Sequence, residues 1–177
     1  MALSARARRK KRLEAARGYL MLGMADHALK ELNGIDDPEK CPFAVNQLRG
    51  EAFQSKEDYT SALKAFRRAY AENPKDVDIL LGMAWCYKRT GQLARSISAM
   101  EEAYHSDPEQ PIVLYNMSCY FALAGNKAQS LSWLGRALRM EAGLRKLIDD
   151  ESDFDSLRDD PDFQLIVGAL DNVKEAS

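Results

Sequence analysis

The chain has 177 residues, of which 46% are apolar and 29% charged, a composition typical of a soluble globular protein with a sizeable core. Its formal net charge of −2 argues against bulk binding of nucleic acid. No apolar run approaches the roughly 18 residues of a membrane-spanning helix, and the basic N-terminus lacks the apolar stretch of a signal peptide. Cys41, Cys86 and Cys119 are far apart and form no CxxC pair, which predicts reduced thiols and a cytoplasmic protein.

The first predicted element is a basic helix that begins after Ser4, a residue type that caps helix N-termini. Six cations precede the first acid, Glu14: Arg6, Arg8, Arg9, Lys10, Lys11 and Arg12. Two interpretations stay open. The charges form a solvated face, or they dock on acid, either the acidic end of a second copy or a phosphate backbone. Nucleic acid is the less favoured partner, because no aromatic residue interleaves the cations.

A period of 34 residues then runs through the chain without insertion. It aligns Ala28, Ala62, Ser96 and Ser130; Leu32, Phe66, Met100 and Leu134; Ile35, Ala69, Ala103 and Ala137; and Lys40, Pro74, Pro108 and Ala142. Four repeats follow from this alignment, at about 9–42, 43–76, 77–110 and 111–144. Repeats of this length predict a stack of similar supersecondary units.

Each repeat holds two helical stripes separated by a turn. In the third repeat the first stripe is Leu80, Met83, Ala84 and Tyr87, and the second is Leu93, Ile97, Met100 and Tyr104. Gly91 separates the two stripes, and Gly125 does so in the fourth repeat, because glycine tolerates the positive φ of such a turn. The second repeat has Glu57 at this position.

These residues resemble the tetratricopeptide-repeat (TPR) family, a 34-residue helix–turn–helix pattern. The second repeat matches best, with Gly50, Phe53, Tyr59, Ala62, Phe66, Ala69 and Pro74. The resemblance covers about residues 9–144, and the first repeat is the most degenerate. It implies an all-α fold, a right-handed superhelical solenoid of antiparallel helix pairs, with the whole chain 1–177 as one domain.

Residues 145–177 are predicted to form a helical acidic cap, since the last repeat of a stack needs its apolar face covered. Its apolar positions are Leu147, Ile148, Phe154 and Leu157, and Pro161 suits the first turn of a final helix carrying Phe163, Ile166, Val167 and Leu170. Eight acids and one arginine lie between Asp149 and Asp162. The segment from Asp153 to Phe163 resembles a tail that often closes bacterial TPR proteins.

No catalytic, cofactor or metal site is predicted. His27 and His105 have no second ligand at metal-binding spacing, and no Gly-rich phosphate loop occurs. Cys86 and Cys119 fall in neighbouring first helices, where we expect buried packing thiols rather than a disulfide. The run Asp149–Glu151 lacks the alternating ligands of a calcium loop, so a solvated turn is expected there. The sequence therefore predicts a protein that is not an enzyme.

In the TPR family the first helices of the repeats line a concave groove that binds a partner peptide or helix. Carried onto this sequence, the groove residues are Leu13, Arg17, Leu20, Gln47, Glu51, Gln54, Leu81, Trp85, Lys88, Tyr115, Asn116, Cys119 and Ala122. Trp85 is the main candidate anchor, with packing between repeats as the open alternative. Leu13, Arg17 and Glu51 do not match the family's clamp for chaperone tails, so peptides with apolar anchors are the expected ligands.

The leading hypothesis is therefore an adaptor or scaffold that binds another protein through this groove. One alternative is self-assembly of copies through the basic first helix and the acidic cap. A more specific variant is a chaperone-like role in bacterial secretion.

Overall fold

The computed structural model describes residues 4–168, which contain helices and turns and no strand. The chain separates into two compact units, Met1–Gln92 and Leu93–Ser177, called unit 1 and unit 2 below. No helix within the described range is long and apolar enough to cross a membrane.

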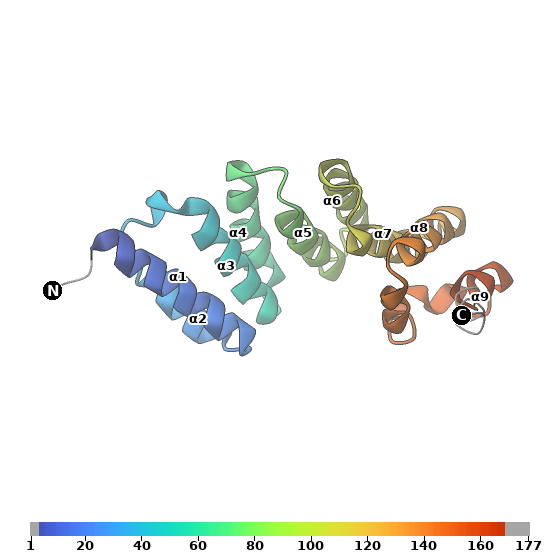
Figure 1. The fold of residues 1–177 in the computed structure, drawn as a ribbon, viewed down its shortest axis with the longest axis horizontal. Coiled ribbons are helices and arrows are strands. Elements are labelled where there is room, and N and C mark those ends of the chain that lie inside the picture. The colour runs from blue at the N-terminus through green and yellow to red at the C-terminus, as the bar shows by residue number, and fades with distance from the viewer. Residues whose placement is uncertain (1–3, 169–177) are drawn as a thin grey trace. The chain divides into compact units, whose positions relative to one another are not determined.

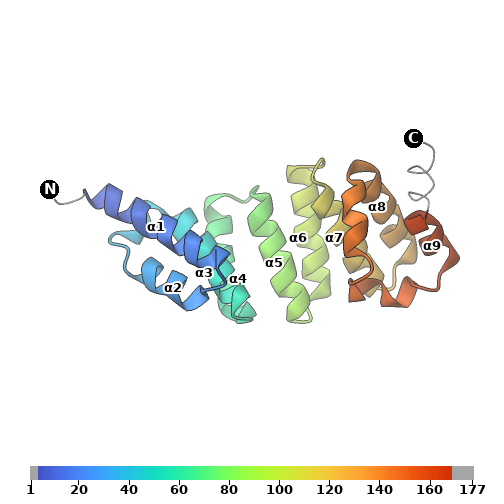
Figure 2. The ribbon, with the colours of Figure 1, turned by 60° about the horizontal axis from the view of Figure 1, so that its bottom comes forward.

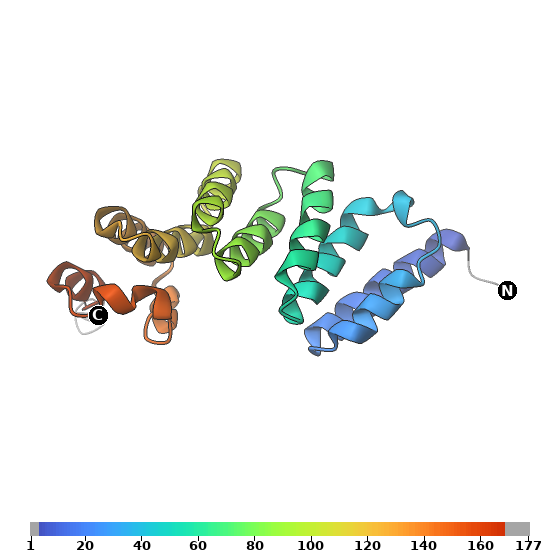
Figure 3. The same cartoon turned by 180° about the vertical axis from the view of Figure 1, so that it is seen from behind.

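Unit 1 contains two helix pairs and the first helix of a third (Figure 1). Its elements are α1 (Ala5–Met21), α2 (Ala25–Asn33), the short 3-10 helix η1 (Pro38–Lys40), α3 (Pro42–Ser55), α4 (Tyr59–Glu72) and α5 (Val77–Arg89). Each helix contacts the next, and α3 also contacts both α1 and α5. The first helices of successive repeats are thus neighbours in one layer, and Figure 3 shows α2 running alongside α1 behind them.

Unit 2 contains α6 (Leu93–Ser106), the pair α7 (Pro111–Leu123) and α8 (Lys127–Met140), and the cap (Figure 2). The cap consists of two 3-10 helices, η2 (Ala142–Leu147) and η3 (Ser152–Leu157), followed by α9 (Pro161–Gly168). η3 packs on α7, while η2 and α9 pack on α8. The predicted final helix beginning at Pro161 is confirmed; Leu170 lies outside the described residues.

The helix starts follow the expected capping chemistry. The N–H of Ala7 donates to Ser4 Oγ at 3.2 Å, which confirms Ser4 as the cap of α1. Asp76 and Asn126 cap α5 and α8 in the same way, by accepting from Ile79 and Gln129. Such caps satisfy backbone donors that the helix itself cannot, so they fix where each helix begins.

The turn inside each repeat has the same backbone geometry four times. Gly23, Glu57, Gly91 and Gly125 all have positive φ, between 58° and 72°. The residue after each of them donates its N–H to an aromatic residue five positions back: Met24 to Tyr19, Asp58 to Phe53, Gln92 to Tyr87 and Asn126 to Phe121, at 2.8–2.9 Å. This is a glycine-type helix C-terminus, and Glu57 adopts it although it is not glycine.

Replacing Glu57 with glycine is expected to stabilise the protein. A side chain in the left-handed region costs about 1–2 kcal/mol, and glycine avoids this cost. We expect Glu57→Gly to raise the free energy of unfolding by about 1 kcal/mol, or the melting temperature by roughly 2–4 °C. The control Gly91→Ala, at the matching turn, should lower it by a similar amount. Urea unfolding measures both, and an unchanged midpoint for Glu57→Gly would contradict the prediction.

The core is made of the positions that recur every 34 residues. All members of the first three aligned columns are buried, from Ala28 to Ala137. In unit 1 the ring of Phe66 on α4 packs against Gly50 on α3 and Gly82 on α5. A Cβ on Gly50 would collide with the Phe66 ring, and a Cβ on Gly82 would approach it to 2.7 Å. The absence of a side chain at these two positions therefore lets the aromatic ring enter between the first helices.

Gly50→Ala is expected to destabilise the protein, even though alanine favours helix more than glycine does. The added methyl group overlaps the Phe66 ring, and overpacking of this kind typically costs about 1–3 kcal/mol. The control Gly18→Ala lies on α1 with nothing within 4 Å of the new Cβ, so it should be neutral or stabilising. Thermal unfolding of the two variants tests the difference, and equal melting temperatures would refute it.

Candidate partner-binding face

Nine of the predicted groove residues lie on the first helices of unit 1, and none of them is fully buried. They are Leu13, Arg17 and Leu20 on α1; Gln47, Glu51 and Gln54 on α3; and Leu81, Trp85 and Lys88 on α5. Because α3 contacts both α1 and α5, these helices present neighbouring surfaces. We call this set of nine residues the unit 1 face.

Trp85 is the largest apolar side chain on the unit 1 face. It is 38% exposed, while Ala84, Cys86 and Tyr87 beside it are buried in the core. The ammonium nitrogen of Lys88 lies 5.1 Å from the centroid of its ring, so the indole is flanked by a cation. The ring therefore retains accessible surface on the helix that carries it, which a purely internal packing residue would not.

Glu51 occupies the middle of the same face. Burial raises the pKa of its carboxyl above the usual 4.5, and nearby Asp78 adds to the rise. A hydrogen bond with Gln47 and the positive charge of Arg17 act in the opposite direction without cancelling the effect of burial. At neutral pH the ionised carboxylate is thus held in an unfavourable environment.

Glu51→Gln is expected to stabilise the folded chain at pH 7. Because the pKa of Glu51 is higher in the folded than in the unfolded state, stability falls as the pH rises through the interval between the two values. The cost is fully present at neutral pH, and it vanishes below the unfolded pKa. The variant should therefore melt at a higher temperature than the parent at pH 7, and the difference should shrink toward pH 4. The exposed Glu39→Gln is the control; a difference independent of pH would contradict the assignment.

The other four predicted groove residues lie on α7 in unit 2, and the structure corrects three of them. Tyr115, Cys119 and Ala122 are buried, because η3 of the cap packs on this side of α7. The ring of Tyr115 contacts Phe154 of η3 edge to face, with 6.0 Å between centroids. Only Asn116 keeps partial exposure. The cap thus covers the surface that the family pattern assigns to a partner, so these three residues are left out of the proposed site.

The charged ends of the chain are partly neutralised within their own units. In unit 1, Arg8 pairs with Asp36 at 3.6 Å, Arg9 with Asp37 at 3.8 Å and Arg12 with Glu31 at 2.9 Å. In unit 2, Lys127 pairs with Asp160 at 2.6 Å and Asp162 at 2.8 Å, and Arg158 with Asp155 at 2.8 Å. Less charge is therefore left for attraction between copies than the sequence suggests.

Unit 2 also contains an aromatic cavity that the sequence did not predict. Its volume is about 490 Å³, and Tyr104 of α6, Phe121 of α7 and Trp133 of α8 line it. Arg136 stands over the Trp133 ring at 4.3 Å and donates to the Tyr104 hydroxyl at 2.7 Å. Trp133, expected to be a packing or convex-face residue, is half-buried here. The cavity joins residues from three helices, and no local spacing marks such a set.

A comparison with protein families matches residues 54–114 to a model described as a tetratricopeptide repeat. The matched stretch includes the Glu57 and Gly91 turns and the buried small residues Ala62 and Ala103, which are the features that define the repeat in this structure. The chain is a tetratricopeptide-repeat protein. No protein of curated function matches it by sequence.

Solved structures support the TPR fold along most of the chain. MamA from Desulfovibrio magneticus RS-1 (residues 41 to the end) is 16% identical, with a TM-score of 0.69 and 75% of each chain covered. Another MamA crystal structure is 18% identical, with a TM-score of 0.69, covering 80% of this chain and 89% of that one. TTC0263, a thermophilic TPR protein of Thermus thermophilus, is 16% identical, with a TM-score of 0.66 and coverage of 91% and 97%. At such identities the likeness shows the fold, an all-α helical repeat.

Proposed function

We propose that this TPR protein is a non-catalytic interaction module whose unit 1 face binds a peptide or helix of a partner protein. The observation that carries the proposal is Trp85, an exposed aromatic ring on the helix layer that the family uses for ligands. Large aromatic side chains dominate many protein interfaces, because they bury much apolar area at a low entropic cost.

The chemistry of the face suggests the kind of peptide that it would bind. Leu81 and Trp85 on α5, with Leu13 and Leu20 on α1, offer apolar surface to apolar anchors. Glu51 lies between these helices on α3, with a carboxylate that burial disfavours. A lysine or arginine of the partner would neutralise this charge. The proposed ligand is therefore a short segment with apolar anchors and a basic residue between them.

A non-catalytic role is also consistent with the titratable groups. Several of the acids with a shifted pKa have structural tasks: Asp58 caps α4, and Asp37 and Asp160 pair with lysines. Charge partners of this kind shift a pKa without any link to chemistry. All three cysteines are thiols rather than halves of a disulfide, which supports the proposal of a reducing, cytoplasmic location.

The test is selection of ligands from a library of displayed peptides, followed by binding measurements on purified variants. The selected peptides should contain apolar anchors and a basic residue. Trp85→Ala should weaken their binding by at least about tenfold, as expected for the loss of an aromatic hot spot. The matched control is Leu165→Ala on α9, which removes an apolar side chain that is 70% exposed outside the face. Peptides that bind Trp85→Ala as tightly as the parent would refute the proposed face.

Glu51→Gln separates the basic-residue part of the proposal from the apolar part. Peptides with lysine or arginine should lose affinity for this variant, while otherwise identical peptides with an uncharged residue there should not. Equal losses for both peptides would remove Glu51 from the ligand contacts without affecting the role of Trp85.

Self-assembly through the charged ends is the alternative function, and light scattering distinguishes it. The ion pairs within each unit favour a mass that does not depend on salt. A multiple of the chain mass at low salt that falls to one chain at high salt would support self-assembly instead.

A further inference from the structure

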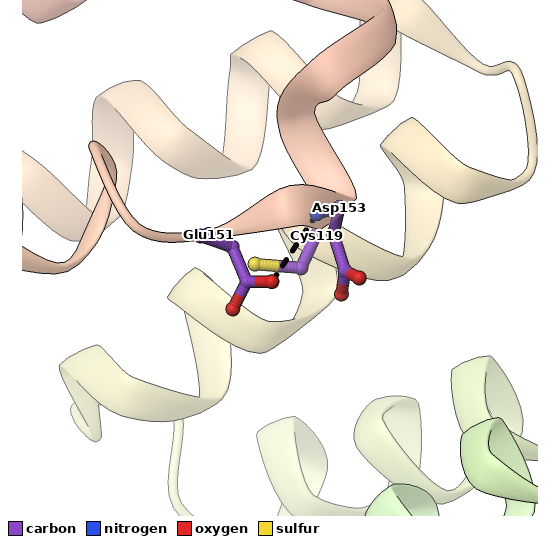
Figure 4. A group of neighbouring side chains, drawn as sticks. All are labelled: Cys119, Glu151 and Asp153. Atoms are coloured by element: carbon purple, nitrogen blue, oxygen red, sulfur yellow. Dashed lines mark hydrogen bonds between the residues drawn. The ribbon is translucent and has the colours of Figure 1, made fainter.

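The cap and α7 bring together three side chains with metal-ligating atoms (Figure 4). Cys119 lies on α7, Glu151 precedes η3, and Asp153 lies in its first turn. The sulfur of Cys119 and one carboxylate oxygen from each acid all lie within 4.8 Å of one another. Cys119 and Asp153 are buried, whereas Glu151 is half-exposed, so the cluster is reached by solvent on one side.

A fourth polar group is directed at the same place. Tyr115 lies one helical turn before Cys119, on the same face of α7. It is 2% exposed, and its buried hydroxyl has no hydrogen-bond partner among the described residues. The hydroxyl is close enough to Cys119, Glu151 and Asp153 for their charges to raise the pKa of Tyr115, beyond the larger effect of burial. A buried hydroxyl without a partner is costly, and it calls for a ligand or an ion.

We propose that Cys119, Glu151 and Asp153 bind a divalent transition-metal cation of the Zn²⁺ type, with the Tyr115 hydroxyl facing the ion. One thiolate and two carboxylates form a mixed sulfur and oxygen donor set. Zn²⁺ accepts such ligands, whereas Ca²⁺ and Mg²⁺ take oxygen ligands alone. The fourth position would be filled by Tyr115 or by water entering beside Glu151.

The geometry requires a modest contraction on binding. Zn–S and Zn–O bonds of about 2.3 and 2.0–2.2 Å put tetrahedral ligand atoms roughly 3.5 Å apart, closer than the 4.8 Å limit observed here. Rotation of the half-exposed Glu151 side chain would supply part of this movement. One Glu151 oxygen already accepts the N–H of Asp153 at 3.2 Å, which leaves its second oxygen for the cation.

Binding would join the cap to the last repeat. Cys119 belongs to the repeat and both acids belong to the cap, so the ion would link η3 to α7 at a second kind of contact besides the Tyr115–Phe154 ring pair. Metal coordination requires the thiolate, so the thiol would release one proton to solvent for each ion bound. An ion that binds only the folded chain would also raise its stability in proportion to the logarithm of the metal concentration.

Titration of the purified, reduced full-length chain with Co²⁺ tests the proposal. Co²⁺ replaces Zn²⁺ in tetrahedral sites and gives a thiolate-to-metal charge-transfer band in the near ultraviolet. We expect this band to saturate at about one equivalent, to be abolished by Zn²⁺, and to be absent in Cys119→Ser. Cys86→Ser is the matched control, because Cys86 is an equally buried thiol in unit 1. No band, or a band that persists in Cys119→Ser, would overturn the proposal.

Glu151→Gln provides a test that does not alter the buried core. Circular dichroism should show this variant folded like the parent, while its affinity for Co²⁺ falls at least about tenfold. Zn²⁺ should raise the melting temperature of the parent and of Cys86→Ser, but raise that of Glu151→Gln by much less. A folded Glu151→Gln chain with unchanged affinity and the same Zn²⁺-dependent rise would contradict the assigned ligands.

Discussion

Close approach of neighbouring helices at positions without a bulky side chain is the constraint on which this structure depends. In unit 1 the ring of Phe66 enters between Gly50 and Gly82, where even a methyl group would meet it. The same column places Met100 and Leu134 in the core of unit 2, beside the buried Ser96 and Ser130. Packing at interior density fixes the distance between helices, and this distance sets which residues of the first helices stay at the surface.

The turns transmit this constraint from one helix to the next. Each of the four turns uses a residue with positive φ and the same backbone hydrogen bond, so each second helix folds back on the first in the same way. With both helices of a pair fixed, the stripe that includes Ala84 and Tyr87 must enter the core. Trp85, one position off that stripe, is then left partly exposed. The proposed binding face is thus a consequence of the packing, and it requires no further device.

The two units use the corresponding surface of their first helices differently. In unit 1 it carries Glu51 and Trp85, one with a disfavoured charge and the other with exposed aromatic area. In unit 2 the cap covers the same side of α7 and buries Tyr115 and Cys119. A repeat at the end of a stack needs such a cover, because its apolar surface has no following repeat. The cover also creates the cluster of Cys119, Glu151 and Asp153, which no single repeat contains.

The sequence by itself determined the repeat period, the helix boundaries and the buried columns, because these depend on local capping, on helical spacing and on the recurrence of small residues such as Ala62 and Ser130. It also indicated the turn at Glu57, since glycine stands 34 residues before and after it. Tertiary structure alone decided that η3 lies on α7 and removes Tyr115 from the surface, and that Glu151 and Asp153 meet Cys119. These contacts join segments far apart in the chain, and the direction in which a cap folds back is set by long-range packing rather than by local periodicity.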